Sequence, residues 1–204
     1  MPTHFSFVIL MVYPEIQSGA KALIFDLDGT LANSIPVHIE CWNLTCQTFN
    51  YHFPVEMMIK MTGMPTVVFA EYVKKDSGCS ISVNDIMKLK KDNFHRLVHT
   101  IKPFEKMADF VKKHHGKIPM SVGTGGGRES SQLILEVIGM RNYFDILVSV
   151  DDVTRHKPEP DTFLKCAELM GIPPAFCQVF EDGEMGMKAA TTAGMMVTDA
   201  RQYY

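Results

Sequence analysis

Five short apolar runs, each ending at polar residues or glycine, dominate the pattern of this sequence. They cover residues 20–25, 118–122, 144–150, 177–180 and 195–198. From the second run onward, segments with the apolar spacing of helices lie between them, at residues 128–138, 161–170 and 185–193. Strands that alternate with helices are typical of a parallel sheet buried between two helical layers. The sequence therefore predicts an α/β fold in which helices cover both faces of one parallel sheet.

Residues 35–101 interrupt this alternation. They carry helical patterns at residues 55–61, 67–75 and 83–98, and they contain no convincing strand. An earlier helix is expected to begin after a cap at Asn33 or Ser34, with Pro36 in its first turn, where proline is tolerated. We therefore predict a small all-helical domain, residues 35–101, inserted into a core domain formed by residues 20–34 and 102–204.

Residues 1–19 fit neither domain. Residues 5–13 are apolar apart from Ser6, but they lack the preceding Lys or Arg and the clear cleavage site of a secretory signal. We expect an N-terminal extension that is poorly ordered, or translation that begins at Met11, with a membrane or partner anchor as the alternative. No apolar run approaches the roughly 18–20 residues of a membrane span, so we expect no membrane association.

Composition narrows the class of partner. The chain of 204 residues has 20 Lys and Arg against 23 Asp and Glu, which gives a net charge of −3. Nucleic-acid-binding proteins normally carry a basic surplus, so we expect no nucleic-acid partner. Five cysteines without a Cys-x-x-Cys pair indicate reduced thiols. We therefore expect a cytoplasmic protein. For its oligomeric state, which composition does not determine, we expect a monomer or weak dimer.

Four of the predicted strands are followed by side chains capable of chemistry. Asp26 and Asp28 follow the first strand, Thr124 the second, Lys157 lies in the loop after the third, and Glu181 and Asp182 follow the fourth. In open parallel sheets, ligands bind beyond the carboxyl ends of the strands. These side chains are therefore predicted to face one site, although Thr124 could instead simply cap the helix that follows it.

The same residues, in this order, resemble the four motifs of the haloacid dehalogenase superfamily. Residues 26–30 read Asp-Leu-Asp-Gly-Thr, Lys157 precedes Pro-Glu-Pro-Asp, and residues 180–182 read Phe-Glu-Asp. The resemblance runs from about residue 20 to the C-terminus. It is closest to the branch of β-phosphoglucomutase and small sugar phosphatases, above all the fructose-1-phosphate phosphatases. It implies a Rossmann-like core and a mobile helical cap that closes over the substrate.

The resemblance also implies roles for these residues. Asp26 would attack phosphorus and form an aspartyl-phosphate, and Asp28 would protonate the leaving oxygen and later activate water. Dehalogenases of the superfamily lack the second aspartate, so Asp28 favours phosphoryl transfer. The phosphate would bind to Thr124, to the backbone N–H groups of Gly125 and Gly126, and to Lys157.

A divalent cation is the expected cofactor. A carboxylate and a phosphate about 4 Å apart repel each other by roughly 4 kcal/mol per pair of charges at an effective dielectric near 20. Bound Mg²⁺ removes most of that repulsion. The resemblance implies Mg²⁺ held by the carboxylates of Asp26 and Asp182 and by the backbone carbonyl of Asp28, with Glu181 as a ligand or helper. The alternative for Glu181 is a side chain that faces outward.

Four residues of the helical insert are predicted to contact the substrate. His38 and Trp42 match the histidine and tryptophan that the family carries on its first cap helix, although Trp42 could instead pack between the domains. Lys90 or Lys91 could reach the leaving group, although a solvated helix face is the default expectation for both. Thr66 stands where phosphomutases carry an arginine for a second phosphate, and a neutral threonine cannot make that bidentate contact.

The sequence thus predicts a Mg²⁺-dependent phosphatase that hydrolyses fructose 1-phosphate or a similar hexose phosphate. A hexose phosphomutase is the alternative. A non-catalytic sensor of phosphorylated metabolites is a further alternative, against which the intact acidic and lysine residues of the motifs argue. His95 and His99 have the spacing of a zinc-binding pair, but they lack the glutamate of an HExxH motif and a nearby cysteine, so we expect an ordinary surface pair.

Overall fold

A five-stranded parallel sheet forms the centre of the computed structural model, which describes residues 12–61 and 64–204. In spatial order the strands are β3 (Ile146–Val148), β2 (Met120–Gly123), β1 (Ala22–Phe25), β4 (Cys177–Glu181) and β5 (Met196–Asp199). All neighbouring strands pair in parallel. The predicted α/β fold is confirmed, and each strand lies close to the apolar run that predicted it.

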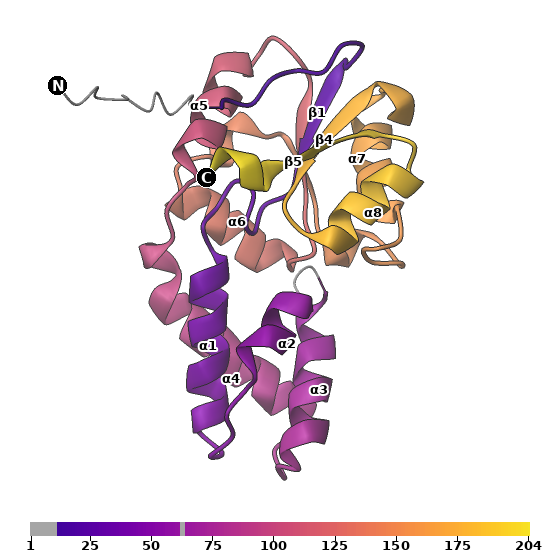
Figure 1. Ribbon diagram of the computed structural model, residues 1–204. Coiled ribbons are helices and arrows are strands. Elements are labelled where there is room, and N and C mark those ends of the chain that lie inside the picture. The colour runs from indigo at the N-terminus through magenta and orange to yellow at the C-terminus, as the bar shows by residue number, and fades with distance from the viewer. Residues whose placement is uncertain (1–11, 62–63) are drawn as a thin grey trace, which may run out of the picture.

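Two layers of helices enclose the sheet. Helices α5 (Glu105–His114) and α6 (Arg128–Val137) lie on one side, and α7 (Asp161–Met170) and α8 (Glu184–Thr192) lie on the other (Figure 1). In β1, Leu23 and Phe25 belong to the apolar cluster of the first side, whereas Ala22 and Ile24 belong to the cluster of the second. Alternate side chains of a strand point to opposite faces, which explains why this strand is apolar throughout.

The inserted helices form a lobe beside the sheet domain (Figure 1). They are α1 (Ile35–Gln47), α2 (Val55–Lys60), α3 (Thr66–Ser77) and α4 (Val83–Leu97). The lobe has an apolar core of its own, in which Trp42 stacks on Phe53 and Phe69 with ring centroids 6.0 and 5.6 Å apart. Short 3-10 helices span Val98–Thr100, Arg141–Tyr143, Val150–Asp152, Pro174–Phe176 and Ala200–Tyr203.

The two chain segments that join the lobe to the sheet domain run side by side. The N–H of Asn33 donates to the carbonyl of Lys102, and the N–H of Phe104 donates to the carbonyl of Leu31, both at 2.9 Å. Residues 35–101 lie between these two connections. A lobe joined through two adjacent segments has the connectivity of a hinged cap.

The expected poorly ordered tail is wrong for residues 12–19. Gln178, fully buried in β4, accepts a hydrogen bond from the backbone N–H of Gln17 at 2.8 Å and donates one to the carbonyl of Glu15 at 3.0 Å. These bonds hold the segment against the sheet. Residues 1–11, with most of the apolar stretch and Met11, lie outside the described residues. Within the part of the chain that is described, no helix is long and apolar enough to cross a membrane.

Candidate active site

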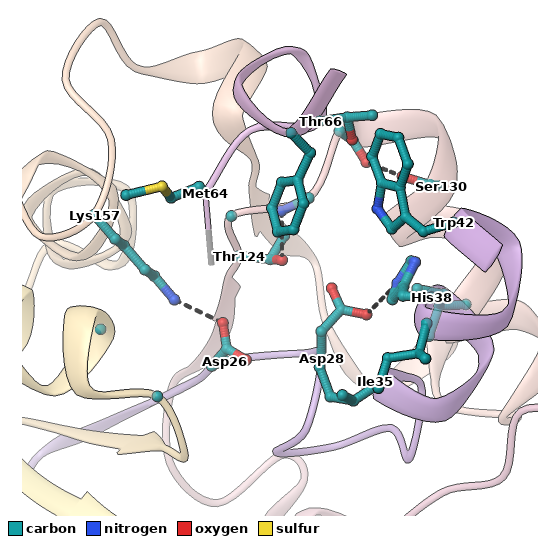
Figure 2. Close-up of a pocket in the computed structure, with 18 of the residues that line it drawn as sticks. Asp26, Asp28, Ile35, His38, Trp42, Met64, Thr66, Thr124, Ser130 and Lys157 are labelled. Atoms are coloured by element: carbon teal, nitrogen blue, oxygen red, sulfur yellow. Dashed lines mark hydrogen bonds and ion pairs between the residues drawn. The ribbon is translucent and has the colours of Figure 1, made fainter. Parts of the chain in front are cut away.

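The carboxyl ends of the central strands open into one pocket between the sheet domain and the helical lobe (Figure 2). Phe25 in β1 pairs with Val122 in β2 and with Phe180 in β4, so the polar residues that follow these strands emerge side by side. Of the residues predicted for the site, the pocket is lined by Asp26, Asp28, His38, Trp42, Thr66, Lys90, Thr124, Gly125, Gly126, Lys157 and Glu181. The remaining one, Asp182, lies in the acidic group described below.

Lys157 connects two of the motifs through buried ion pairs. Its Nζ lies 2.6 Å from Oδ1 of Asp26 and 2.7 Å from Oε2 of Glu181. Burial alone would lower the pKa of Lys157, but the two carboxylates more than compensate and raise it, so the side chain stays charged. Burial and the neighbouring Glu181 raise the pKa of Asp26 well above its usual value, against the opposing effect of Lys157.

Asp26, Glu181 and Asp182 form an acidic group. One carboxylate oxygen from each lies within 4.8 Å of the others. Burial and the charge of Glu181 raise the pKa of Asp182 to about 7, although Thr30 donates a hydrogen bond to its Oδ1 at 3.0 Å. Lys157 supplies one positive charge to three carboxylates. Hard oxygen donors with excess negative charge fit a divalent cation such as Mg²⁺. Glu181 is 3% exposed, so the alternative of an outward-facing side chain is wrong.

Glycines allow the acidic group to pack closely. Gly29 has a φ of +91°, and a Cβ atom at this position would run into the carboxylate of Asp182. A Cβ atom at Gly186, in α8, would run into the carboxylate of Glu181. The turn that follows β1 therefore requires glycine at position 29, because it needs a positive φ and has no room for a Cβ atom.

Asp28 points away from the acidic group and toward the helical lobe (Figure 2). His38 Nε2 lies 3.0 Å from its Oδ1, and Lys90 Nζ lies 3.1 Å from Nδ1 of the same histidine. An ammonium group can only donate, so Nδ1 accepts from Lys90 and the Nε2–H group donates to Asp28. Lys90 thus selects the tautomer of His38 that binds Asp28.

The electrostatics of this chain of contacts favour an ionised Asp28. Burial would raise the pKa of Asp28, but His38, a hydrogen bond from Ser34 and the charge of Lys90 together lower it. Burial lowers the pKa of His38 and that of Lys90. Ser34 holds the N-cap position of α1 without capping it; its hydroxyl donates to Asp28 Oδ1 at 2.5 Å instead. The helix-capping role expected for Ser34 is therefore wrong.

The loop after β2 differs in one detail from the prediction. The hydroxyl of Thr124 accepts a hydrogen bond from the N–H of Gly126 at 2.9 Å, so this amide is occupied within the loop. Gly127, and not Thr124, holds the N-cap position of α6, so Thr124 does not cap that helix. The N–H of Thr124 donates to Val148 in the neighbouring strand β3.

Several pocket residues had no signal in the sequence. Ile35, Ile39 and Phe69 form an apolar wall from the lobe together with Trp42, and Ser130 faces it from the first turn of α6. Trp42 lines the pocket and packs in the core of the lobe, whereas the alternative weighed for it is packing between the domains. Apolar positions are recognised from spacing as core, and spacing alone does not indicate which core residues also border a cavity.

Comparison with known proteins agrees with this arrangement. The family model described as haloacid dehalogenase-like hydrolase matches residues 23–200. A protein named fructose-1-phosphate phosphatase YqaB, from Escherichia coli K12, is 36% identical over 180 residues, which are 88% of this chain and 95% of that protein. A β-phosphoglucomutase from Bacillus subtilis is 24% identical over 193 residues, 89% of this chain and 84% of its own length.

Solved structures show the same fold. The crystal structure of a β-phosphoglucomutase from Clostridium difficile superposes with a TM-score of 0.78 at 17% identity, covering 88% of this chain and 84% of that one. Because the family model covers most of the chain and the E. coli relative matches it almost end to end, the family is established. The chain is an enzyme of the haloacid dehalogenase-like hydrolase family, which its four motifs resemble.

Proposed function

We propose that this protein is a Mg²⁺-dependent phosphatase that hydrolyses small sugar phosphates, such as fructose 1-phosphate or a similar hexose phosphate, through an aspartyl-phosphate. One observation carries the proposal: two aspartates two residues apart lie in opposite environments. Asp26 belongs to the buried acidic group and forms an ion pair with Lys157, and the pKa of Asp26 is raised. Asp28 is held by His38, and its pKa is lowered. Asp26 lies among the residues proposed to hold the metal, whereas Asp28 faces the helical lobe and contacts its histidine (Figure 2), and this difference in position fits a nucleophile and a separate acid and base.

The proposed reaction assigns one role to each aspartate. A carboxylate oxygen of Asp26 forms a bond to phosphorus while the bond from phosphorus to the sugar oxygen breaks. Asp28, which takes up a proton from solvent as the dianionic substrate enters, gives that proton to the sugar oxygen. Water then attacks phosphorus, Asp28 takes its proton, and phosphate leaves with Asp26 restored. The dianionic phosphate raises the pKa of Asp28 as it enters, because like charges disfavour the carboxylate. Lys157 and Thr124 are proposed to bind the phosphoryl oxygens.

The residues proposed to hold Mg²⁺ are Asp26 and Asp182, with the backbone carbonyl of Asp28 as in the family pattern. Glu181 bonds to Lys157 through Oε2 and accepts a hydrogen bond from the N–H of Gly183 through Oε1, at 3.0 Å. Because both oxygens are occupied, these bonds support a role in which Glu181 orients neighbouring groups and does not bind the metal itself. Bound Mg²⁺ would offset the repulsion between the Asp26 carboxylate and the phosphate.

The charges of the pocket favour a monophosphate with an uncharged leaving group. Among the described residues that line it, the cationic side chains are Lys157, engaged with Asp26, and Lys90, engaged with His38. Arg128 begins α6 nearby, but its guanidinium binds both oxygens of Asp152 at 2.5 Å and the carbonyl of Leu147. Lys157 is assigned to the transferred phosphoryl group, while Lys90 and Arg128 are held by His38 and Asp152. None of these cations is then left for a second phosphate, which disfavours the mutase alternative. The name of the E. coli relative supports fructose 1-phosphate.

The test is a substrate panel with and without Mg²⁺. We expect fructose 1-phosphate to be hydrolysed far better than fructose 1,6-bisphosphate or 2-phosphoglycolate, and only with the metal. Asp26→Asn should lower kcat by at least about a thousandfold, whereas Asp109→Asn, at an exposed position of α5, should not change it. Equal rates for Asp26→Asn and the unchanged protein would remove Asp26 from the mechanism. Isomerisation of β-glucose 1-phosphate that requires a bisphosphate primer would establish the mutase instead.

A further inference from the structure

Two neighbouring lysines of α4 point to different partners across the boundary between the lobe and the sheet domain. Lys90 is buried and contacts His38 in the pocket. Lys91 is exposed, and its Nζ lies 2.6 Å from Oε2 of Glu129, in the first turn of α6. His95, one turn further along α4, lies 3.6 Å from Oε1 of the same glutamate. One carboxylate of the sheet domain therefore contacts two basic side chains on one face of a lobe helix.

The place of this contact gives it a consequence for the site. Lys90 reaches His38 only if α4 lies at the right distance from the base of α1, and Lys91 is the next residue along the helix. A bond that holds Lys91 to the sheet domain therefore also holds the backbone of Lys90. We propose, on the basis of the phosphatase function above, that Glu129 is a positioning residue. Glu129 holds α4 at the position where Lys90 contacts His38, and this contact maintains the hydrogen bond from His38 to Asp28.

The architecture of α6 supports a positioning role. The residue before Glu129, Arg128, is fixed to the loop after β3: its N–H donates to Asp151 at 2.7 Å and its guanidinium binds Asp152. Glu129 thus projects from a turn that is anchored to the sheet domain. The pair with Lys91 has side chains 55% and 66% exposed, so its strength depends on ionic strength and is modest. A modest contact can shift a cap between open and closed positions that differ little in free energy.

Charge exchange tests the proposal. The variants are Glu129→Lys, Lys91→Glu and the double exchange, with Glu136→Lys and Lys88→Glu as controls. The controls make the same change of charge at exposed positions of the same two helices. The rate measurement is kcat/KM for fructose 1-phosphate at low ionic strength. The binding measurement is the affinity for inorganic phosphate, followed by the fluorescence of Trp42, the one tryptophan of the chain, and checked by calorimetry.

We expect each single exchange to lower kcat/KM and phosphate affinity by about three- to tenfold, as for a weak exposed ion pair turned into repulsion. The double exchange should return both values to within about twofold of the original, as coupling between two contacting residues requires. A fold defect would not be rescued in this way. The proposal is overturned if Glu129→Lys behaves like Glu136→Lys, or if the double exchange remains as impaired as the single ones.

The two measurements separate this proposal from the phosphatase function. If the unchanged protein hydrolyses no phosphate ester, yet phosphate affinity falls in the single exchanges and recovers in the double, the cap contact stands and the proposed reaction is wrong. If hydrolysis is observed but neither quantity responds to the exchanges, the reaction stands and Glu129 has no positioning role.

Discussion

The ammonium group of Lys157 lies 2.6 Å from Oδ1 of Asp26, and both side chains are almost completely buried. In the proposed reaction, this contact would place a positive charge where phosphoryl oxygens gather. The same ammonium group bonds to Glu181, so a single cation balances much of the charge at the base of the pocket. Removing it leaves two buried carboxylates without their partner.

Lys157→Met is therefore expected to impair both stability and catalysis. Breaking a buried ion pair by removing one partner typically costs about 3–5 kcal/mol of unfolding free energy. The loss of a charge that stabilises the transition state should lower kcat by about a hundred- to a thousandfold. Urea unfolding and steady-state kinetics measure the two effects. Lys165→Met, which removes a more exposed lysine of α7 paired with Glu168, is the control and should alter neither. Unchanged kcat in Lys157→Met would contradict the assigned role.

Lys90→Met should impair the acid step selectively. Without Lys90, His38 Nδ1 loses its donor, and the tautomer that binds Asp28 is no longer favoured. We expect kcat/KM for fructose 1-phosphate to fall by about a hundredfold, the lower end of the range for general acid catalysis. With 4-nitrophenyl phosphate, whose phenolate leaves without a proton, kcat/KM should change little. Lys88→Met, at an exposed position of the same helix, is the control. An equal loss on both substrates would indicate a binding role instead.

The sheet and the motif residues could be predicted because local pattern and topology determine them. A strand covered on both faces needs apolar side chains throughout, as in residues 22–25, and parallel strands bring the residues after their ends to one edge. Asp26, Thr124 and Glu181 therefore meet without any knowledge of the loops between them. Their positions directly after the strands were enough to predict that they lie close together.

Other parts of the site could not be predicted because they depend on contacts distant in sequence. Lys90 and Lys91 are adjacent residues of the same type, so the sequence does not distinguish them. The orientation of α4 about its axis places Lys90 in the pocket and Lys91 against Glu129. Ser34 satisfies the rule for a helix cap, yet the turn after β1 brings Asp28 closer to its hydroxyl. Gln17 and Gln178 are 161 residues apart, and neither shows a local signal for their pairing.

Metal affinity should increase with pH through the titration of Asp182. Its pKa is about 7 in the metal-free fold, and a cation must displace the proton to bind its carboxylate. The deprotonation of Asp182 should therefore raise the apparent affinity for Mg²⁺ by up to about tenfold per pH unit below pH 7. Calorimetric titration at several pH values measures this, with proton release found by varying the buffer. In Asp182→Asn the dependence should become weaker, and what remains would report Asp26, whose pKa is also raised; a pH-independent affinity in the unchanged protein would contradict the assignment.

The stability of the metal-free protein should show the opposite dependence on pH. The pKa values of Asp182 and Asp26 are higher in the folded chain than in the unfolded chain, so the folded state binds more protons between pH 3.8 and about 7. The contribution of these two groups to the unfolding free energy should therefore decrease as pH rises through this range, by at most about 1.4 kcal/mol per pH unit for each group, and the lowered pKa of His38 opposes it in part. Thermal unfolding in EDTA measures the decrease, and added Mg²⁺ should reverse it most strongly at the upper end.

Gly186→Ala should destabilise the protein although it replaces a glycine inside a helix. In an unobstructed helix this substitution stabilises by roughly 1 kcal/mol. At Gly186, however, the added methyl group would run into the carboxylate of Glu181, which Lys157 and the Gly183 N–H hold in place. We expect a lower unfolding free energy and weaker Mg²⁺ binding. In the background of Glu181→Ala the obstruction is gone, so the same substitution should stabilise by up to about 1 kcal/mol. Urea unfolding measures the change in unfolding free energy in each background, and a change of opposite sign isolates the contact between Gly186 and Glu181. If the substitution has the same effect in both backgrounds, close packing at Gly186 does not organise the acidic group.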